Sequence, residues 1–293
     1  MANLLPVLLL CRTADTELGA VADRSAAQMS GENFPVALRF LPRAARDDLA
    51  RVYRFARFVD DVGDETAGGP EHRLALLDAV ATDLRELDGG HPGLQPVADL
   101  RPLVRRGVPV QPFLDLVEAN RVDQRVSEYE TFDDLLGYCR LSAAPVGRLV
   151  LHVARAATEH NVADSDAVCA ALQVLEHCQD VGEDARAGRV YLPASELRVA
   201  GVQRAHLTGA ATPDALRGVV AQQVARSRQL LRSGRPLVRR LHGWARLAVA
   251  GYVAGGLATA DALENRGYAV LDSSIRPAKS RTAGHAARQL IPW

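Results

Sequence analysis

The chain has 293 residues, of which 48% are hydrophobic and 5% aromatic, and its 35 Lys and Arg residues balance its 35 Asp and Glu residues. This balance argues against a basic footprint for nucleic acid and against a general attraction to anionic partners. Its four cysteines lack paired spacing, which argues against a disulfide scaffold and fits a reducing cytoplasm.

The chain opens with an apolar run at residues 4–10. This run is too short to span a bilayer and no basic residue precedes it, so we interpret it as core packing or as a peripheral contact with a membrane. Helical periodicity then dominates, and no segment alternates like a strand. The predicted helices cover residues 43–64, 70–88, 95–106, 111–126, 131–159, 163–186, 212–233 and 236–266.

This pattern predicts an all-α bundle in a single domain. Turns rich in Gly and Pro separate the helices, and no internal repeat or low-complexity linker is present. The predicted organisation is an N-terminal extension (1–30), a helical domain (31–272) and a basic C-terminal tail (273–293).

An acidic cluster ends the first long predicted helix. Asp60 and Asp64 lie four residues apart, so a helix places both carboxylates on one face, where like charges repel. Asp61 and Glu65 add negative charge at the C-terminal end of the helix, where the macrodipole already disfavours anions. Arg57, one turn before Asp60, could pair with it or bind a substrate phosphate.

The same spacing recurs on the predicted helix 163–186. Asp180 and Asp184 repeat it, and Glu176 adds one more turn to the stripe. One such pair alone would indicate a solvated acidic helix end. Two together predict facing carboxylates inside the bundle that share a cation. Oxygen ligands favour Mg²⁺, which takes one or two protein carboxylates and completes its shell with water and phosphate oxygens, so the pattern favours a diphosphate site.

Three segments carry a resemblance to a known family. They are 53–65 (Tyr-Arg-Phe-Ala-Arg-Phe-Val-Asp-Asp-Val-Gly-Asp-Glu), 179–184 (Gln-Asp-Val-Gly-Glu-Asp) and 188–193 (Gly-Arg-Val-Tyr-Leu-Pro). In order and spacing they resemble the two aspartate motifs and the following loop of squalene and phytoene synthases. The resemblance extends over about residues 32–268. It implies a single all-α isoprenoid synthase bundle around a central apolar cavity.

Two more segments indicate which group of enzymes within this family the chain resembles. Residues 30–37 (Ser-Gly-Glu-Asn-Phe-Pro-Val-Ala) and 138–148 (Tyr-Cys-Arg-Leu-Ser-Ala-Ala-Pro-Val-Gly-Arg) are similar to bacterial hydroxysqualene synthases of hopanoid pathways, which start from presqualene diphosphate. Synthases that join two prenyl diphosphates carry a tyrosine where this chain has Leu141. An aliphatic side chain cannot relay a proton, so we expect that joining reaction to be impaired or absent. The resemblance implies Mg²⁺-dependent conversion of presqualene diphosphate to hydroxysqualene with release of diphosphate.

The resemblance also implies roles for individual residues. The catalytic Mg²⁺ ligands would be Asp60, Asp64, Asp180 and Asp184. Asp61, Glu65 and Glu176 would support them, although relatives commonly carry asparagine at the position of Glu176. The diphosphate would be bound by Arg57, Arg189 and Tyr191, with Gln179 beside it.

The carbocation that forms when diphosphate leaves would need an apolar surrounding and a water. The rings of Tyr53, Phe55 or Phe58 would steady the cation, or they belong to the core. Glu176 or Asn33 would orient the water that adds to it. Asn33 equally suits a helix cap or a turn.

Other readings stay open at this point. The chain could be a squalene, presqualene diphosphate or phytoene synthase that joins two prenyl diphosphates. From another class, an all-α Mg²⁺-dependent nucleotide pyrophosphatase would need a polar base pocket, and a non-enzymatic helical scaffold would bind no diphosphate.

NADPH is not expected, and the eight histidines, scattered without ligand spacing, are interpreted as surface or core residues. The expected partner is a prenyl or presqualene diphosphate, without nucleic acid. The expected location is the cytoplasm. Because the product is hydrophobic, peripheral contact with the inner membrane face is also compatible with the sequence. The sequence does not define an oligomeric state.

Overall fold

The computed structural model describes residues 14, 16–25, 41–87, 89–272, 282, 284–286 and 289. Within these residues the fold is all-α, as predicted, with one isolated β-bridge between Glu128 and Val190. No helix in the described ranges is long and apolar enough to cross a membrane. Asn33, the apolar run at 4–10 and residues 273–281 of the tail lie outside the described residues.

The contacts within the chain divide it into two compact units, Met1–Arg125 and Val126–Trp293. In the first unit, the long helices α2 (Arg43–Asp64), α3 (Pro70–Arg85) and α6 (Gln111–Asp123) pack against one another. Helix α2 has the predicted bounds.

Two aromatic residues of α2 belong to the core of this unit. Phe55 and Phe58 are fully buried, and the ring of Phe55 meets that of Phe113 edge to face, with 5.3 Å between the ring centroids. Of the two roles that the sequence left open for these phenylalanines, the structure gives them the core role.

The prediction of one helix over 95–106 is wrong. The segment forms two short helices, α4 (Gln95–Ala98) and α5 (Arg101–Val104), and Pro102 stands in the first turn of α5. Because proline has no N–H, it cannot continue the hydrogen bonds of the preceding turn.

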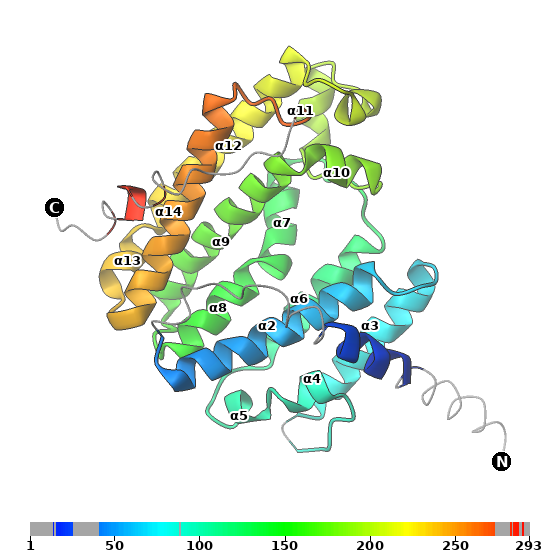
Figure 1. Cartoon of the computed structure of the whole chain (residues 1–293), viewed down its shortest axis with the longest axis vertical. Helices are drawn as coiled ribbons and strands as arrows, with labels where there is room; N and C mark the ends of the chain where they lie inside the picture. Colours follow the sequence, from blue (N-terminus) through cyan, green and yellow to red (C-terminus); the bar gives the residue numbers. More distant parts are fainter. Residues whose placement is uncertain are drawn as a thin grey trace. The chain divides into compact units, whose positions relative to one another are not determined.

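The second unit is built around α9 (Glu159–Gln179). Helices α7 (Phe132–Ser142), α8 (Ala144–Val153), α12 (Asp214–Gly234) and α14 (Gly243–Asn265) all pack against it. In Figure 1, α9 is green and lies beside α12 in yellow and α14 in orange. The unit also contains α10 (Val181–Arg186), α11 (Ala194–Val199), a 3-10 helix η2 (Arg204–Thr208) and α13 (Pro236–Arg240).

Three of the long helices predicted in this unit are interrupted. The segment 131–159 divides at Ala143, because Pro145 in the first turn of α8 cannot donate to the carbonyl of Leu141. The segment 163–186 begins earlier, at Glu159, where the side chain of Thr158 caps it. It then breaks at Asp180, which ends α9 and precedes α10.

The segment 236–266 divides into α13 and α14. Leu241 and His242 adopt extended backbone between them. Helices α11 and η2 were not predicted, since each is too short to show a helical period.

A glycine brings α8 close to α9. A Cβ placed on Gly147 would lie 2.4 Å from Ser165 Oγ and 2.6 Å from Cys169 Sγ, so only glycine permits this approach. Gly147 belongs to the segment 138–148 that supported the family resemblance. Its role in the structure is to set the spacing of two helices that line the pocket described below.

Candidate functional site: two acidic motifs and an apolar pocket

The first motif lies at the end of α2. Asp60 accepts a hydrogen bond from Asn120 Nδ2 of α6 at 3.1 Å. The pKa of Asp60 is raised to about 6, chiefly by desolvation, although the residue is exposed. The hydrogen bond from Asn120 lowers this pKa, and the charge of Asp64 raises it. The crowding inferred from the spacing therefore adds to desolvation as a cost to the ionised Asp60.

Asp61 lies beside Asp60 in the chain but is buried. Its carboxylate accepts a hydrogen bond from Ser25 Oγ and forms an ion pair with Arg57 Nε at 2.9 Å. Arg57 also reaches Glu65, with 3.4 Å between Nη2 and Oε1. Arg57 thus forms ion pairs with Asp61 and Glu65, and its charge also lowers the pKa of Asp60, the partner that the sequence had suggested as one of two alternatives.

Gly63 lies between the two aspartates of the motif and against α6. A Cβ at this position would lie 2.3 Å from Asn120 Oδ1, and the carbonyl of Gly63 accepts a hydrogen bond from Gln124 Nε2 at 3.0 Å. Asn120 was not identified from the sequence. No motif marks it, because its relation to Asp60 arises only when α6 packs on α2.

The second motif spans the break between α9 and α10. The backbone N–H of Asp184 donates to the carbonyl of Asp180 at 2.8 Å, so the two residues remain one helical turn apart. The pKa of Asp180 is raised to about 6, chiefly by burial, with smaller contributions from the charges of Asp184 and Glu176. The second motif therefore repeats the electrostatic character of the first.

A buried histidine adjoins this motif. His177 is 7% exposed, and its ring stacks on that of Tyr191 with 3.7 Å between centroids and 12° between planes. Its Nδ1 lies 3.7 Å from Asp184 Oδ2, and its Nε2 lies 3.2 Å from Gln173 Nε2. The sequence had left His177 among eight surface or core histidines, so its place beside the acidic motif was missed.

The loop after α10 is fixed by backbone hydrogen bonds. The N–H of Arg189 donates to the carbonyl of Asp184 at 2.8 Å, and that of Val190 donates to the carbonyl of Ser127 at 2.7 Å. These bonds hold the predicted diphosphate-binding residues Arg189 and Tyr191 next to the second motif. Gln179, the last residue of α9, directly precedes Asp180.

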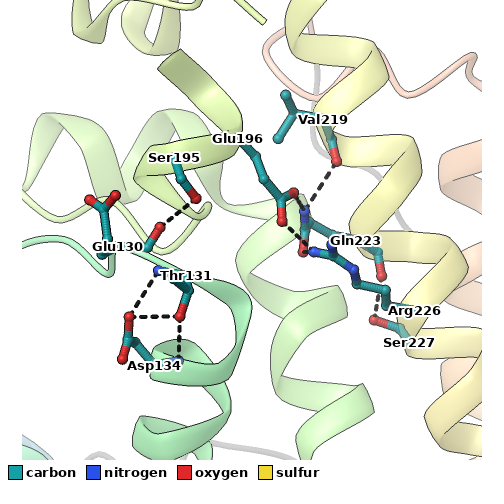
Figure 2. A network of polar contacts seen from close by, with 9 residues as sticks. All are labelled: Glu130, Thr131, Asp134, Ser195, Glu196, Val219, Gln223, Arg226 and Ser227. Atoms are coloured by element: carbon teal, nitrogen blue, oxygen red, sulfur yellow. Dashed lines mark hydrogen bonds and ion pairs between the residues drawn. The ribbon is translucent and has the colours of Figure 1, made fainter. Parts of the chain in front are cut away.

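Polar contacts anchor the far end of this loop (Figure 2). Ser195 Oγ donates to the carbonyl of Glu130 at 2.7 Å, next to the capping box that starts α7. Glu196 accepts hydrogen bonds from Gln223 and Arg226 of α12. The loop is therefore tied to α7 and α12, which limits how far Tyr191 can move.

An apolar pocket of about 250 Å³ lies in the second unit. It is lined by residues of α7, α8, α9, α13 and α14, among them Val146, Val150, Leu172, Leu237 and Val249. Gln173 and Glu176 also line it, and Asp180 follows Glu176 by one helical turn on α9. Ser142 and Ala143, which directly follow Leu141, form part of the same wall.

No group of three or more His, Cys, Asp or Glu side chains in the described part of the chain is arranged to hold a metal ion. The donors come instead as two pairs of carboxylates, and in each pair one member, Asp60 or Asp180, has a raised pKa. Paired carboxylates fit Mg²⁺ that is shared with a phosphate group, because that ion keeps water and substrate oxygens in its shell.

Comparison with known proteins then decides the family. The model of the family described as squalene/phytoene synthase matches residues 27–283. The chain belongs to the squalene/phytoene synthase family. It is 38% identical to a hydroxysqualene synthase of Rhodopseudomonas palustris and 36% identical to one of Sinorhizobium fredii, in each case over 73% of both chains.

A solved structure also resembles this member of the family. The crystal structure of a squalene synthase from Alicyclobacillus acidocaldarius is 35% identical and has a TM-score of 0.74, covering 86% of this chain and 96% of that one. The fold and the family that the sequence motifs implied are thereby confirmed.

Proposed function

We propose that this protein converts presqualene diphosphate to hydroxysqualene and releases diphosphate, with Mg²⁺ as the required ion. One observation carries the proposal: the pocket wall on α9, at Gln173 and Glu176, leads directly to the acidic motif, which begins at Asp180 at the C-terminal end of that helix. A diphosphate held at the motif would direct its hydrocarbon part into a pocket of matching character. The identity with two hydroxysqualene synthases supports this assignment.

Asp60 and Asp64 in one motif, and Asp180 and Asp184 in the other, are the proposed Mg²⁺ ligands. Bound there, Mg²⁺ would neutralise the charge of the leaving diphosphate. Arg189 and Tyr191, held beside Asp184 by the anchored loop, are the proposed diphosphate contacts, with Gln179 next to them. Glu176, as part of the pocket wall, is proposed to act at the boundary between motif and pocket.

Three residues support the first motif. The carboxylate of Asp61 already has two protein partners, so its proposed role is indirect: it orients Arg57. Arg57 and Glu65 form an ion pair on the same face, from which Arg57 would turn to a diphosphate. Tyr53, half-buried on α2, keeps its predicted role as a substrate contact.

The pocket and Leu141 each argue against one of the two main alternatives. A nucleotide pyrophosphatase would need polar groups for a base, whereas the surface of this pocket is largely apolar, with Val and Leu as its commonest lining residues. A synthase that joins two prenyl diphosphates would need the proton-relaying tyrosine that Leu141 replaces. Peripheral contact with a membrane stays a prediction, based on the hydrophobic product.

The test supplies purified protein with Mg²⁺ and presqualene diphosphate, without NADPH, and measures diphosphate release and extracted hydroxysqualene. A parallel reaction receives farnesyl diphosphate. We expect hydroxysqualene from the first reaction and no C30 product from the second. Turnover of farnesyl diphosphate alone would assign the chain to the joining synthases.

A further inference from the structure

The orientation of the His177 ring follows from its two contacts. An amide nitrogen can only donate, so the 3.2 Å contact with Gln173 Nε2 makes His177 Nε2 the acceptor. A neutral imidazole then carries its proton on Nδ1, the nitrogen 3.7 Å from Asp184 Oδ2. The ring therefore lies between a carboxylate of the acidic motif and an amide in the pocket wall.

Packing holds the ring in this orientation. One face of the imidazole is stacked on Tyr191, and Tyr138 lies 6.3 Å away between ring centroids. The rings of Tyr138 and Tyr191 in turn pack against each other, with 5.6 Å between their centroids. Because aromatic rings enclose the imidazole, the direction of its Nε2 toward Gln173 is fixed in advance of substrate binding.

Gln173 and Glu176 differ from most of the pocket wall. They stand one turn apart on α9, at the pocket end that leads to Asp180, among mostly aliphatic neighbours. A water inside a protein needs two to four polar partners to stay in place. An amide and a carboxylate one turn apart in a largely apolar pocket supply such partners.

We propose that His177 is a positioning residue for the water that ends the reaction. It holds the Gln173 side chain so that the amide, together with the Glu176 carboxylate, fixes one water at the polar end of the pocket. This inference rests on the proposed function and names the residues that would make the product an alcohol.

This step requires only the carbocation, one water and the released diphosphate. A lone pair of the water oxygen forms the C–O bond to the carbocation left by ionisation. One water proton passes to the released diphosphate, which leaves as hydrogen diphosphate. If the water is not held, the cation loses a proton from a neighbouring carbon and gives a hydrocarbon, so the ratio of alcohol to hydrocarbon reports on the water alone.

The experiment compares the full-length wild type with His177→Phe, which keeps a ring to stack on Tyr191, and with Gln173→Leu. Each protein receives Mg²⁺ and presqualene diphosphate in H₂¹⁸O. Diphosphate release is measured together with the amounts of ¹⁸O-labelled alcohol and of hydrocarbon. We expect both variants to release diphosphate within about threefold of the wild type. We expect their alcohol-to-hydrocarbon ratio to fall about tenfold, the factor that corresponds to loss of one hydrogen bond.

Two further variants sharpen the result. His177→Gln offers Gln173 a side-chain carbonyl as acceptor in place of the ring nitrogen, and it should recover part of the alcohol yield. His160→Phe makes the same change at an exposed histidine of α9 and should leave the ratio unchanged.

The proposal is overturned if the ratio is unchanged in either His177→Phe or Gln173→Leu, because His177 is proposed to act through Gln173. If His177→Phe does not fold, as judged by thermal melting, Gln173→Leu decides alone. Failure of the proposed function looks different, because the wild type itself would then release no diphosphate from presqualene diphosphate, and the role of His177 would fall with it.

Discussion

Asp60 and Asp61 are neighbours in the sequence, yet their carboxylates have opposite electrostatic surroundings. Asp61 is buried between Ser25 and Arg57, which stabilise its charge. At Asp60, desolvation and, to a smaller extent, the charge of Asp64 destabilise the ionised form and raise its pKa to about 6. The same substitution at the two positions should therefore change stability in opposite directions.

Asp61→Asn is expected to destabilise the fold. The change removes the charge that pairs with Arg57 and weakens the bond to Ser25, so about 1 to 3 kcal/mol of unfolding free energy should be lost. Urea denaturation of the metal-free protein measures this difference. An unchanged denaturation midpoint would mean that the buried pair contributes nothing, and that Asp61 is available to bind metal directly.

Asp60→Asn and Asp180→Asn are expected to abolish turnover without harming the fold. Each removes a proposed Mg²⁺ ligand and also relieves repulsion from a neighbouring carboxylate, Asp64 in one case and Asp184 in the other. The melting temperature at pH 7 without Mg²⁺ should be equal to or above that of the wild type. Diphosphate release and thermal melting on the same samples separate the two effects. Full activity in both variants would contradict the assigned roles.

The response to Mg²⁺ should depend on pH. Asp60 and Asp180 have pKa values of about 6 in the folded protein, against an ordinary value of 3.8. Between these values the metal-free folded state binds more protons than the unfolded state, so its stability falls as pH rises through this window. Mg²⁺ binds the deprotonated carboxylates and should restore the lost stability above pH 6.

Thermal melting from pH 5 to pH 8, with and without Mg²⁺ and inorganic diphosphate, checks this expectation. The gain from the ions should be small at pH 5 and largest above about pH 6.5. In the double variant Asp60→Asn, Asp180→Asn the gain should be small at every pH. A gain that is the same at pH 5 and pH 8 in the wild type would argue against binding at these carboxylates.

Gly63→Ala should destabilise the first unit. The new methyl group would lie 2.3 Å from Asn120 Oδ1, so Asn120 would have to move and its bond to Asp60 would be lost. We expect a loss of about 1 to 3 kcal/mol in unfolding free energy. Gly218→Ala on α12 is the matched control, because no atom lies within 4 Å of its added methyl. There the higher helix propensity of alanine should stabilise the protein by up to about 1 kcal/mol. Equal effects at both glycines would rule out the proposed clash.

Local sequence signals predicted α2 and the two acidic motifs well. The apolar stripe of α2, its start after Pro42 and the four-residue spacing of Asp60 and Asp64 all depend on residues close together in the sequence, so local patterns reveal them. The resemblance of these motifs to a known family also predicted the isoprenoid synthase fold. Helix interruptions were harder to recognise, because the apolar pattern continues through Pro145 and Pro102 even though their missing N–H groups end the hydrogen bonding.

The residues that support the site were missed for a different reason. Asn120 reaches Asp60 across 60 positions of sequence, and His177 stacks on Tyr191 only when the loop after α10 folds back over α9. Such relations depend on packing between helices. A single sequence without this packing offers no pattern that separates these two residues from any other Asn or His.

The close contact at Gly63 bears on how other sequences are searched for this activity. The glycine sits inside the acidic motif, so the spacing of the carboxylates and the docking of α6 are encoded in the same five positions. A search pattern that requires only the aspartates would accept chains whose residue 63 pushes the neighbouring helix away. A pattern that also requires a residue without a side chain there would select for a supported carboxylate as well as a charged one.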